Sequence, residues 1–373
     1  MNLNYPIVRR KSRAVKAGSV IIGGGFPIAI QSMTNADTRD VEATVRQANQ
    51  LFDAGADIVR VSVLDADAAD KLPDIRARIT KPLVADIHFQ YKHALKAIEA
   101  GFDKVRINPG NIGEDWKVRE VTKAAKDNGI PIRIGVNSGS LPKDLLAQFG
   151  HDDPRAFVEA ALREAAVLEE LDFHDIVISV KSTDTTTAFW AYHMLAEKCD
   201  YPLHVGITEA GTLETGTIKS SVGIGAILLT GIGDTIRVSL AADPIHEVRV
   251  AKQILKSCAL RKEGVEIIAC PTCGRCQIDL IPLAESIEKK TRHIKASLKV
   301  AVMGCPVNGP GEAAAADVGI TGGKGKAILM KKGEIIKTAP ESELEQMLLD
   351  EIEAMTGEKV EHAIDDNTDT QRI

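Results

Sequence analysis

A strand–helix unit recurs eight times between Pro27 and Cys258, and this repeat constrains the fold more than any other feature of the chain. The β-rich runs are Ile28–Ser32, Ile58–Val63, Leu83–His88, Lys104–Asn108, Ile132–Asn137, Ile176–Ser179, Leu203–Thr208 and Thr235–Ser239. Strands that alternate with helices pair in parallel through right-handed crossovers. Eight such units match the usual size of a (β/α)8 barrel, which has roughly 250 residues. The alternative is an open, doubly wound sheet, for which we would expect a Gly-x-Gly-x-x-Gly turn after an early strand, and no such turn occurs. We therefore predict an α/β chain with an N-terminal TIM barrel.

The first helical stretch, Arg39–Ala54, shows how the helices are delimited. Its apolar residues recur at helical spacing, which predicts one buried face. Asp37 or Thr38 is placed to cap its start, and Gly55 to end it.

Four predicted strands share one sequence pattern: an apolar residue, an arginine, an apolar residue and a small or polar residue. Side chains alternate along a strand, and barrel active sites lie at the carboxyl ends of the strands. The residues expected at that mouth are Arg60, Asp86, His88, Arg106, Asn108, Arg133, Asn137, Lys181, Ser182, His204, Arg237 and Ser239.

Five of these residues are cations in a chain whose net charge is −6. Guanidinium groups match phosphate oxygens, and each charge-assisted hydrogen bond contributes about 1.5–3 kcal/mol. With only Asp86 and Glu209 nearby to neutralise them, we expect a small, multiply anionic ligand such as a diphosphate; the alternative is that each arginine pairs with a carboxylate inside the barrel. Replacing Arg106 or Arg237 by alanine should then weaken ligand binding and leave thermal stability nearly unchanged.

Composition argues against two other classes of function. A surplus of acidic residues, 52 against 46 basic ones, and 4% aromatic residues are atypical of nucleic-acid binders. No apolar run reaches the roughly 18 residues of a membrane span. The segment Met1–Ala17 lacks the pattern of a secretory signal, so we expect a cytoplasmic protein whose six cysteines serve metal or redox chemistry.

The repeat stops after Cys258, which predicts a barrel over residues 1–258, a second α/β domain over 259–360 and a frayed tail over 361–373. In the second domain we predict strands Val265–Ala269 and Leu298–Met303, a helix Ile278–Arg292, several short strands to Ile336, a hairpin at Gly322–Lys326 and a closing helix Glu341–Met355.

Four cysteines of this second domain are spaced like metal ligands. Cys270, Cys273 and Cys276 precede the predicted helix, and Cys305 follows a strand. A zinc site commonly takes its ligands from two paired-cysteine knuckles, and here the second knuckle supplies one cysteine. A Cys-x2-Cys-x2-Cys run with a distant Cys-Pro is closer to iron–sulfur ligation. Spacing therefore favours an iron–sulfur cluster on these four thiols and leaves zinc open.

Six segments together resemble the 4-hydroxy-3-methylbut-2-enyl diphosphate synthases, iron–sulfur enzymes of the methylerythritol phosphate route to isoprenoids, in their two-domain bacterial form. They are Pro27–Thr34 (PIAIQSMT), Val105–Asn111 (VRINPGN), Arg133–Ser140 (RIGVNSGS), Ile207–Gly211 (ITEAG), Cys270–Cys273 and Met303–Glu312.

The resemblance implies a TIM barrel that binds 2-C-methyl-D-erythritol 2,4-cyclodiphosphate and a smaller, sulfite-reductase-like α/β domain that carries a [4Fe–4S] cluster. It implies the ligands Cys270, Cys273, Cys305 and Glu312, with Cys276 outside the set; an oxygen ligand is exchangeable and leaves one iron able to open for substrate. Glu209 and Glu312 are the implied catalytic residues, Glu209 as proton donor or as the group that steers the leaving hydroxyl.

The resemblance also implies partners: flavodoxin or ferredoxin as electron donor, and a head-to-tail homodimer in which one subunit's cluster domain closes over the other's barrel. Two alternatives belong to other classes. One is a phosphate-binding TIM barrel with a structural zinc module and non-redox transferase chemistry. The other is an iron–sulfur carrier without catalysis, which would need no ring of arginines.

Overall fold

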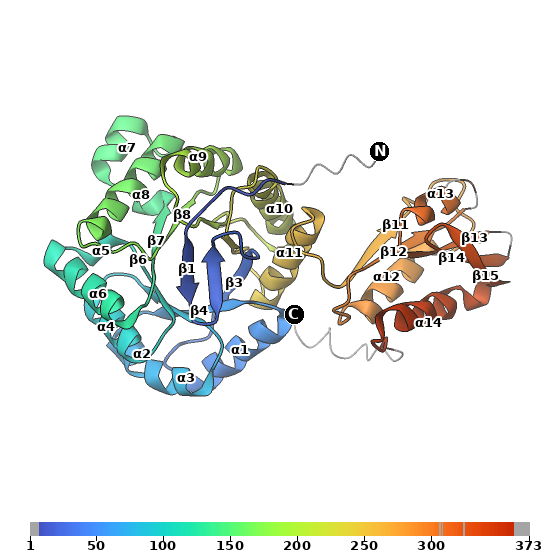
Figure 1. Ribbon diagram of the computed structural model, residues 1–373, viewed down its shortest axis with the longest axis horizontal. Helices are drawn as coiled ribbons and strands as arrows, with labels where there is room; N and C mark the ends of the chain where they lie inside the picture. The colour runs from blue at the N-terminus through green and yellow to red at the C-terminus, as the bar shows by residue number, and fades with distance from the viewer. Residues whose placement is uncertain (1–6, 306, 308, 324, 362–373) are drawn as a thin grey trace. The chain divides into compact units, whose positions relative to one another are not determined.

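The computed structural model describes residues 7–305, 307, 309–323 and 325–361. The chain folds into two compact units, one ending at Arg261 and the other beginning at Lys262 (Figure 1). The predicted boundary lies three residues earlier, at Cys258. The predicted tail falls almost wholly outside the described residues, which end at Glu361.

The first unit contains an eight-stranded parallel sheet in the order β8-β7-β6-β5-β4-β3-β10-β9. A parallel bridge between Ile178 and Leu203 joins its two ends, which closes the barrel and confirms the predicted fold. The strands are β3 (Ala29–Met33), β4 (Ile58–Val63), β5 (Leu83–Ile87), β6 (Lys104–Ile107), β7 (Ile132–Asn137), β8 (Ile176–Lys181), β9 (His204–Val205) and β10 (Thr235–Ile236).

Helices surround this barrel, as Figure 1 shows. They are α1 (Val41–Ala54), α2 (Ala66–Asp70), α3 (Leu72–Arg78), α4 (Tyr91–Glu99), α5 (Pro109–Ile112), α6 (Asp115–Asn128), α7 (Lys143–Phe149), α8 (Pro154–Glu169), α9 (Thr185–Lys198), α10 (Leu213–Leu229) and α11 (Pro244–Ser257), with a 3₁₀ turn at Ser138–Ser140. Gly55 ends α1 in the left-handed region, as predicted. The expected cap was wrong: Asp40 accepts the Ala43 N–H, because the Asp37 carboxylate is bound to Arg39.

A hairpin that was not predicted from the sequence covers the amino ends of the strands. It consists of β1 (Ala14–Ala17) and β2 (Val20–Gly23). Its buried residues, Val15, Ala17 and Ile22, form one apolar cluster with Ala29, Ile58, Val84 and Val177, near the starts of four barrel strands. The hairpin therefore closes this end of the barrel with apolar side chains.

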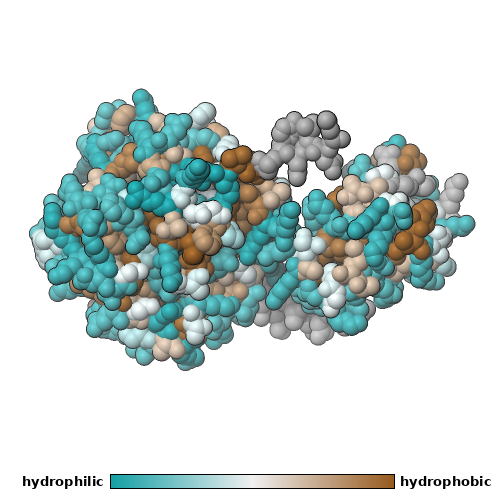
Figure 2. All heavy atoms as spheres, viewed as in Figure 1, coloured by the Kyte–Doolittle hydropathy of each residue, from teal (hydrophilic) through white to brown (hydrophobic). Residues whose placement is uncertain are grey.

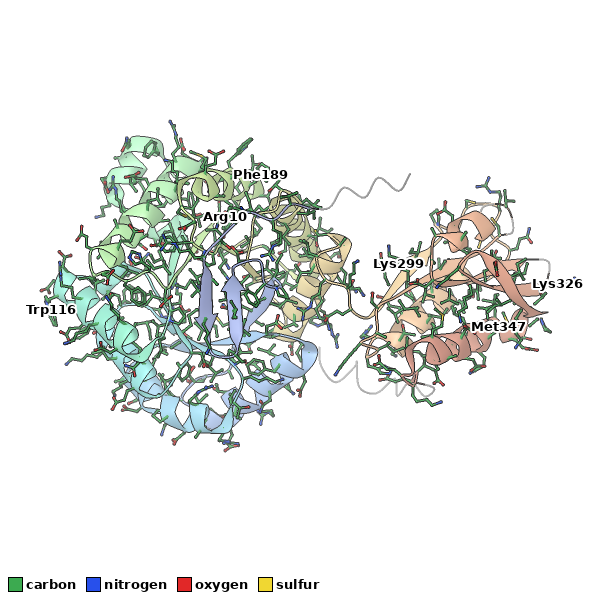
Figure 3. All side chains as sticks on the ribbon, viewed as in Figure 1. Arg10, Trp116, Phe189, Lys299, Lys326 and Met347 are labelled. Atoms are coloured by element: carbon green, nitrogen blue, oxygen red, sulfur yellow. The ribbon has the colours of Figure 1, made fainter. Side chains whose placement is uncertain are left out.

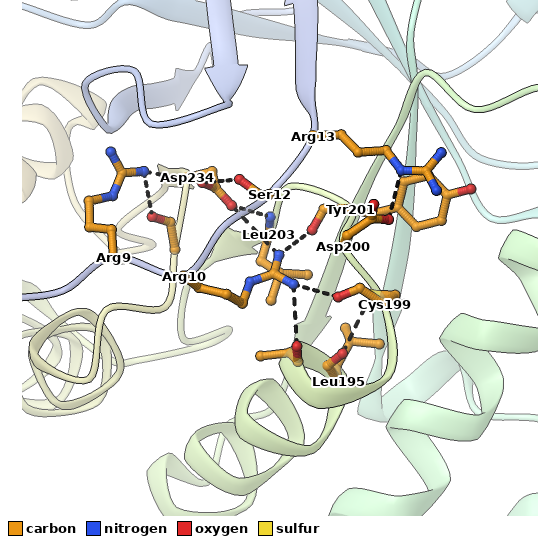
Figure 4. Close-up of polar contacts among 12 residues, drawn as sticks. Arg9, Arg10, Ser12, Arg13, Leu195, Cys199, Asp200, Tyr201, Leu203 and Asp234 are labelled. Atoms are coloured by element: carbon orange, nitrogen blue, oxygen red, sulfur yellow. Dashed lines mark hydrogen bonds and ion pairs between the residues drawn. The ribbon is translucent and has the colours of Figure 1, made fainter.

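Buried Asp234 fastens the segment before the hairpin to the barrel (Figure 4). Its carboxylate accepts from Arg9 Nη2 at 3.1 Å, Ser12 Oγ at 2.8 Å and the Leu203 N–H at 2.9 Å. Arg13 Nε lies 2.7 Å from Asp200 Oδ1. These N-terminal cations are therefore structural.

The second unit is built on a five-stranded sheet in the order β11-β12-β13-β14-β15, in which the first three strands are parallel. Its elements are β11 (Val265–Ala269), α12 (Leu280–Thr291), β12 (Leu298–Met303), α13 (Gly309–Ala314), β13 (Val318–Gly323), β14 (Lys326–Lys331), β15 (Glu334–Pro340), a 3₁₀ turn at Glu341–Glu343 and α14 (Leu344–Thr356). Met347 of α14, labelled in Figure 3, is buried in the core. The predicted hairpin is present between β13 and β14, with Lys324 outside the described residues.

One face of α10 is apolar and exposed. Ile218, Val222 and Leu229, which follow one another at helical spacing, are 58–62% exposed. Figure 2 shows apolar surface in the region of this helix. No helix in the described part of the chain is long and apolar enough to cross a membrane.

Candidate active site

Asp86 is the carboxylate around which the barrel arginines gather. It lies on β5 and is paired in register with Arg106 on β6, which in turn is paired with Arg133 on β7. Asp86 Oδ1 lies 3.3 Å from Arg106 Nη1, and Asp86 Oδ2 lies 3.6 Å from Arg60 Nε and 3.7 Å from His88 Nε2. The structure thus brings together five of the predicted site residues.

The charge state of Asp86 follows from these neighbours. Burial alone would favour the neutral acid, but the charges of Arg60, Arg106 and Arg133 outweigh it and lower the pKa of Asp86 to about 2. The carboxylate is therefore ionised at neutral pH and is shared between two guanidinium groups.

Arg237 has a different partner, Glu247 of α11. Arg237 Nη2 lies 3.4 Å from both carboxylate oxygens of Glu247. Glu247 is buried and also accepts the Leu240 N–H at 3.0 Å. The expectation that only Asp86 and Glu209 could neutralise the arginines was therefore wrong, because a residue of a surrounding helix points inward and supplies a second carboxylate.

Cationic side chains still outnumber carboxylates in this part of the barrel. Arg133 and Lys181 are buried, and burial together with the repulsion of neighbouring cations holds the pKa of each well below its usual range. The charges of Arg133, Arg237 and Arg60 disfavour protonation of Lys181, and the carboxylate of Glu247 favours it. The four guanidinium groups of Arg60, Arg106, Arg133 and Arg237 outnumber the carboxylates of Asp86 and Glu247, which leaves a positive excess before Lys181 is counted.

Several buried nitrogen atoms have no hydrogen-bond partner among the described residues. Six of them belong to residues expected at the mouth from the sequence: His88 Nδ1, Arg106 Nε, Asn108 Nδ2, Arg133 Nε, His204 Nε2 and Arg237 Nε. The other three are Lys104 Nζ, Gln31 Nε2 and Arg10 Nε. An unsatisfied buried donor costs about 1–3 kcal/mol. A ligand with several anionic oxygens at the mouth would satisfy donors of the first group.

Asn108, Asn137, Ser182 and Ser239 lie at the ends of the strands or just beyond them. Asn108 caps α5 by accepting the Asn111 N–H at 3.3 Å, and Ser182 accepts the Asp184 N–H at 3.1 Å. Asn137 ends β7 and caps the turn at Ser138–Ser140. Ser239 is half-buried beyond β10.

His204 and Glu209 are placed very differently from each other. His204 on β9 is fully buried, and burial lowers its pKa well below 6.5, so the imidazole is neutral. Glu209 is exposed and makes no ion pair with a described residue; neither Arg237 nor Lys181 holds it. Its φ of 50° lies in the left-handed region, which is strained for a glutamate and typical of functional loops.

Two further polar residues inside the barrel were missed. Lys104 is fully buried at the start of β6, and its pKa is lowered by burial and by Arg133 and Arg60. Since Lys104 and Arg106 are two residues apart on one strand, the alternation that identified Arg106 also predicts the face of Lys104. Gln31 on β3 is buried as well.

In the second unit, Cys270 and Cys305 follow the ends of the adjacent parallel strands β11 and β12, so they come to one edge of the sheet. Cys273 lies beyond β11 in the same loop as Cys270 and is exposed. The Arg275 N–H and guanidinium lower the pKa of the Cys273 thiol. Glu312, also exposed, lies on α13, whose first N–H donates to the Cys305 carbonyl at 3.2 Å.

Gly304, between β12 and Cys305, leaves space for the thiols. A Cβ at this position would collide with Cys276 Sγ and lie 3.5 Å from Cys270 Sγ. Within the described ranges, no three His, Cys, Asp or Glu side chains converge as a single metal ion requires. Each iron of an iron–sulfur cluster binds its own protein ligand. The ligands of a cluster therefore lie farther apart than the ligands of a single zinc ion. Cys270 and Cys305 at one edge of the sheet, with Cys273 in the same loop as Cys270, fit such a cluster.

Comparisons with known proteins cover both units. The GcpE TIM-barrel domain matches residues 12–252, and the GcpE protein C-terminal domain matches residues 266–354. A relative from Clostridium perfringens described as 4-hydroxy-3-methylbut-2-en-1-yl diphosphate synthase (flavodoxin) is 57% identical over 93% of this chain and 99% of its own. A relative of the same description from Caldanaerobacter subterraneus subsp. tengcongensis is 56% identical over 94% of this chain and 99% of its own.

Among solved structures, a dihydropteroate synthase from Stenotrophomonas maltophilia matches 66% of this chain and 97% of its own chain, with a TM-score of 0.49 and 16% identity. A likeness this low carries no argument about function.

Proposed function

The chain belongs to the GcpE family, and from this premise we propose that its barrel binds 2-C-methyl-D-erythritol 2,4-cyclodiphosphate while its second unit carries a [4Fe–4S] cluster. The activity is the reductive formation of 4-hydroxy-3-methylbut-2-enyl diphosphate, a step of the methylerythritol phosphate route, and the enzyme is an iron–sulfur oxidoreductase. The alternative of a zinc module with non-redox transferase chemistry is not favoured.

The main support for the proposed substrate site is the excess of buried hydrogen-bond donors around Asp86. Arg60, Arg106, Arg133, Lys181 and Arg237 supply positive charge, and the unpartnered nitrogens supply hydrogen bonds for phosphate oxygens. Asp86 and Glu247 hold three of the guanidinium groups in fixed orientations before substrate arrives. Such preorganisation lowers the cost of binding a dianion.

The same cations assist ring opening. As the ring C–O bond breaks, negative charge develops on a phosphate oxygen, and guanidinium groups already in place stabilise it. Because burial keeps His204 uncharged, it can donate or accept a hydrogen bond without altering the charge of the site. Glu209, on its strained turn, is the residue we assign to proton donation or to steering of the hydroxyl that leaves as water.

We assign the cluster ligands to Cys270, Cys273, Cys305 and Glu312, with Cys276 outside the set. When bound, a [4Fe–4S] cluster supplies electrons one at a time. A carboxylate is a harder and more readily exchanged ligand for iron than a thiolate. Glu312 is therefore the ligand that substrate could replace. The exposure of Glu312 and Cys273 is consistent with a site open to substrate and to an electron donor.

Flavodoxin is the electron donor that the relatives' descriptions name, and we propose it or a ferredoxin for this chain. We also propose a homodimer in which one subunit's cluster serves the other's barrel. The apolar, exposed face of α10 supports association with a second copy, because apolar area is costly to leave in water.

Anaerobic turnover tests this function. Chain purified without oxygen should convert the cyclodiphosphate to 4-hydroxy-3-methylbut-2-enyl diphosphate with a chemical reductant, and iron and acid-labile sulfide should be present together. Zinc without sulfide, and no product, would overturn the proposal.

A further inference from the structure

Cys276 is the thiol of the cysteine motif that the proposed ligand set leaves unused. Two backbone hydrogen bonds fix its place relative to Cys270. The Cys270 N–H donates to the Val302 carbonyl at 3.2 Å, and the Gln277 N–H donates to the Gly304 carbonyl at 2.8 Å. Both ends of the Cys270–Gln277 segment are therefore held at the carboxyl end of β12, two residues apart along the strand.

The side chains converge as well. Cys270 Sγ and Cys276 Sγ lie against the same point, the space that a Cβ of Gly304 would fill. Both side chains pack against the apolar cluster that contains Leu280, and both are half-buried free thiols. Cys276 donates one weak hydrogen bond, to the Ile278 carbonyl at 3.4 Å, which is easily given up.

We propose that Cys270 and Cys276 are an oxidative modification site: in the cluster-free chain they form a disulfide, with Cys276 as the resolving thiol. The residues between them lie in neither a helix nor a strand, so the sulfurs can close the remaining distance without breaking regular structure. Glutathione disulfide is the oxidant. The thiolate of one cysteine attacks it and releases one glutathione thiol, and the other cysteine attacks the protein sulfur of the mixed disulfide and releases the second. Two cysteines are oxidised and two glutathione thiols are formed.

The consequence rests on the proposed function, in which Cys270 is a cluster ligand. A disulfide blocks cluster assembly while it lasts, but it is reversed by thiols, whereas sulfinic and sulfonic acids are not reversed in this way. Cys276 thus protects the proposed ligand Cys270 from irreversible oxidation. The pairing itself is a property of the chain and does not depend on that ligand set.

Peptide mapping of the full-length chain tests the pairing. The chain is stripped of metal with a chelator, incubated with glutathione disulfide, alkylated and digested with trypsin. Cleavage after Arg275 separates Cys270 from Cys276, so their disulfide links two peptides, residues 263–275 and 276–289. Because Cys273 shares the first peptide, Cys273→Ser is the matched control: the link should persist in it and vanish in Cys270→Ser and Cys276→Ser. In wild type, two of the six thiols should be lost to titration under denaturing conditions.

A link that persists in Cys270→Ser, or glutathione adducts on separate peptides with no link in wild type, overturns the proposal. Iron and sulfide analysis of the anaerobically purified wild type is the separate measurement for the proposed function. A chain that binds a cluster but fails the mapping refutes the disulfide alone.

Discussion

Asp86 and Arg106 occupy paired positions on neighbouring barrel strands, and Asp86 Oδ1 lies 3.3 Å from Arg106 Nη1. The carboxylate also faces Arg60, so its removal leaves two guanidinium groups without their shared partner. We expect Asp86→Asn to lower the free energy of unfolding by about 3–5 kcal/mol, the usual result of breaking one side of a buried ion pair. Urea unfolding measures this. Asp53→Asn, on the exposed side of α1, is the control and should change stability by less than about 0.5 kcal/mol.

The same carboxylate makes stability depend on pH. Its pKa is lowered from 3.8 to about 2 in the folded chain, so folding favours the ionised form. The resulting stabilisation, ~2 kcal/mol, is complete above pH ~4 and is lost as the pH falls through about 2. The stability difference between wild type and Asp86→Asn should therefore shrink as the pH is lowered across this window. A difference that stays constant in acid unfolding would contradict the ionised state.

Arg237→Ala should weaken substrate binding and also destabilise the fold, which revises the expectation drawn from sequence. Arg237 is paired with buried Glu247, and its removal leaves that carboxylate uncompensated. In Arg237→Ala/Glu247→Gln the stranded charge is gone, so thermal stability should recover while affinity for the cyclodiphosphate stays at least tenfold weaker. Calorimetric titration and melting temperature separate the two effects. Arg119→Ala, exposed on α6, should alter neither.

Most of the barrel and the cationic face of its strands could be predicted because both depend on local periodicity. Arg60, Arg106 and Arg133 alternate with apolar residues that must face the helices, so the arginine side chains must point into the barrel. Glu247 could not be found this way. Whether a helical residue points into a barrel depends on how the helix packs, and the first turn of α11 gives no such signal. The β1–β2 hairpin was missed because neither of its strands is followed by a helix, so it lies outside the strand–helix repeat.

Cys305→Ser and Cys276→Ser should differ sharply in cluster content. Cys305 follows β12 at the sheet edge shared with Cys270, and we assign it as a ligand, whereas Cys276 is outside the set. Iron and acid-labile sulfide should collapse in the Cys305 variant and stay near the wild-type content in the Cys276 variant when both are purified anaerobically. Equal loss in both would return Cys276 to the ligand set, and Cys199→Ser, in the barrel unit, controls for handling.

Glu209→Gln should lower kcat strongly, by roughly 10²-fold or more, because general acid catalysis typically contributes that much. KM should change little, since the cations around Asp86 hold the diphosphate. Stability should also change by less than about 0.5 kcal/mol, because Glu209 is exposed and has no ion pair with a described residue to lose. Glu214→Gln, also exposed and five residues farther along, is the matched control and should keep wild-type turnover. Near-normal kcat in Glu209→Gln would remove this residue from the chemistry and leave its left-handed backbone, at φ 50°, as a feature of the turn alone.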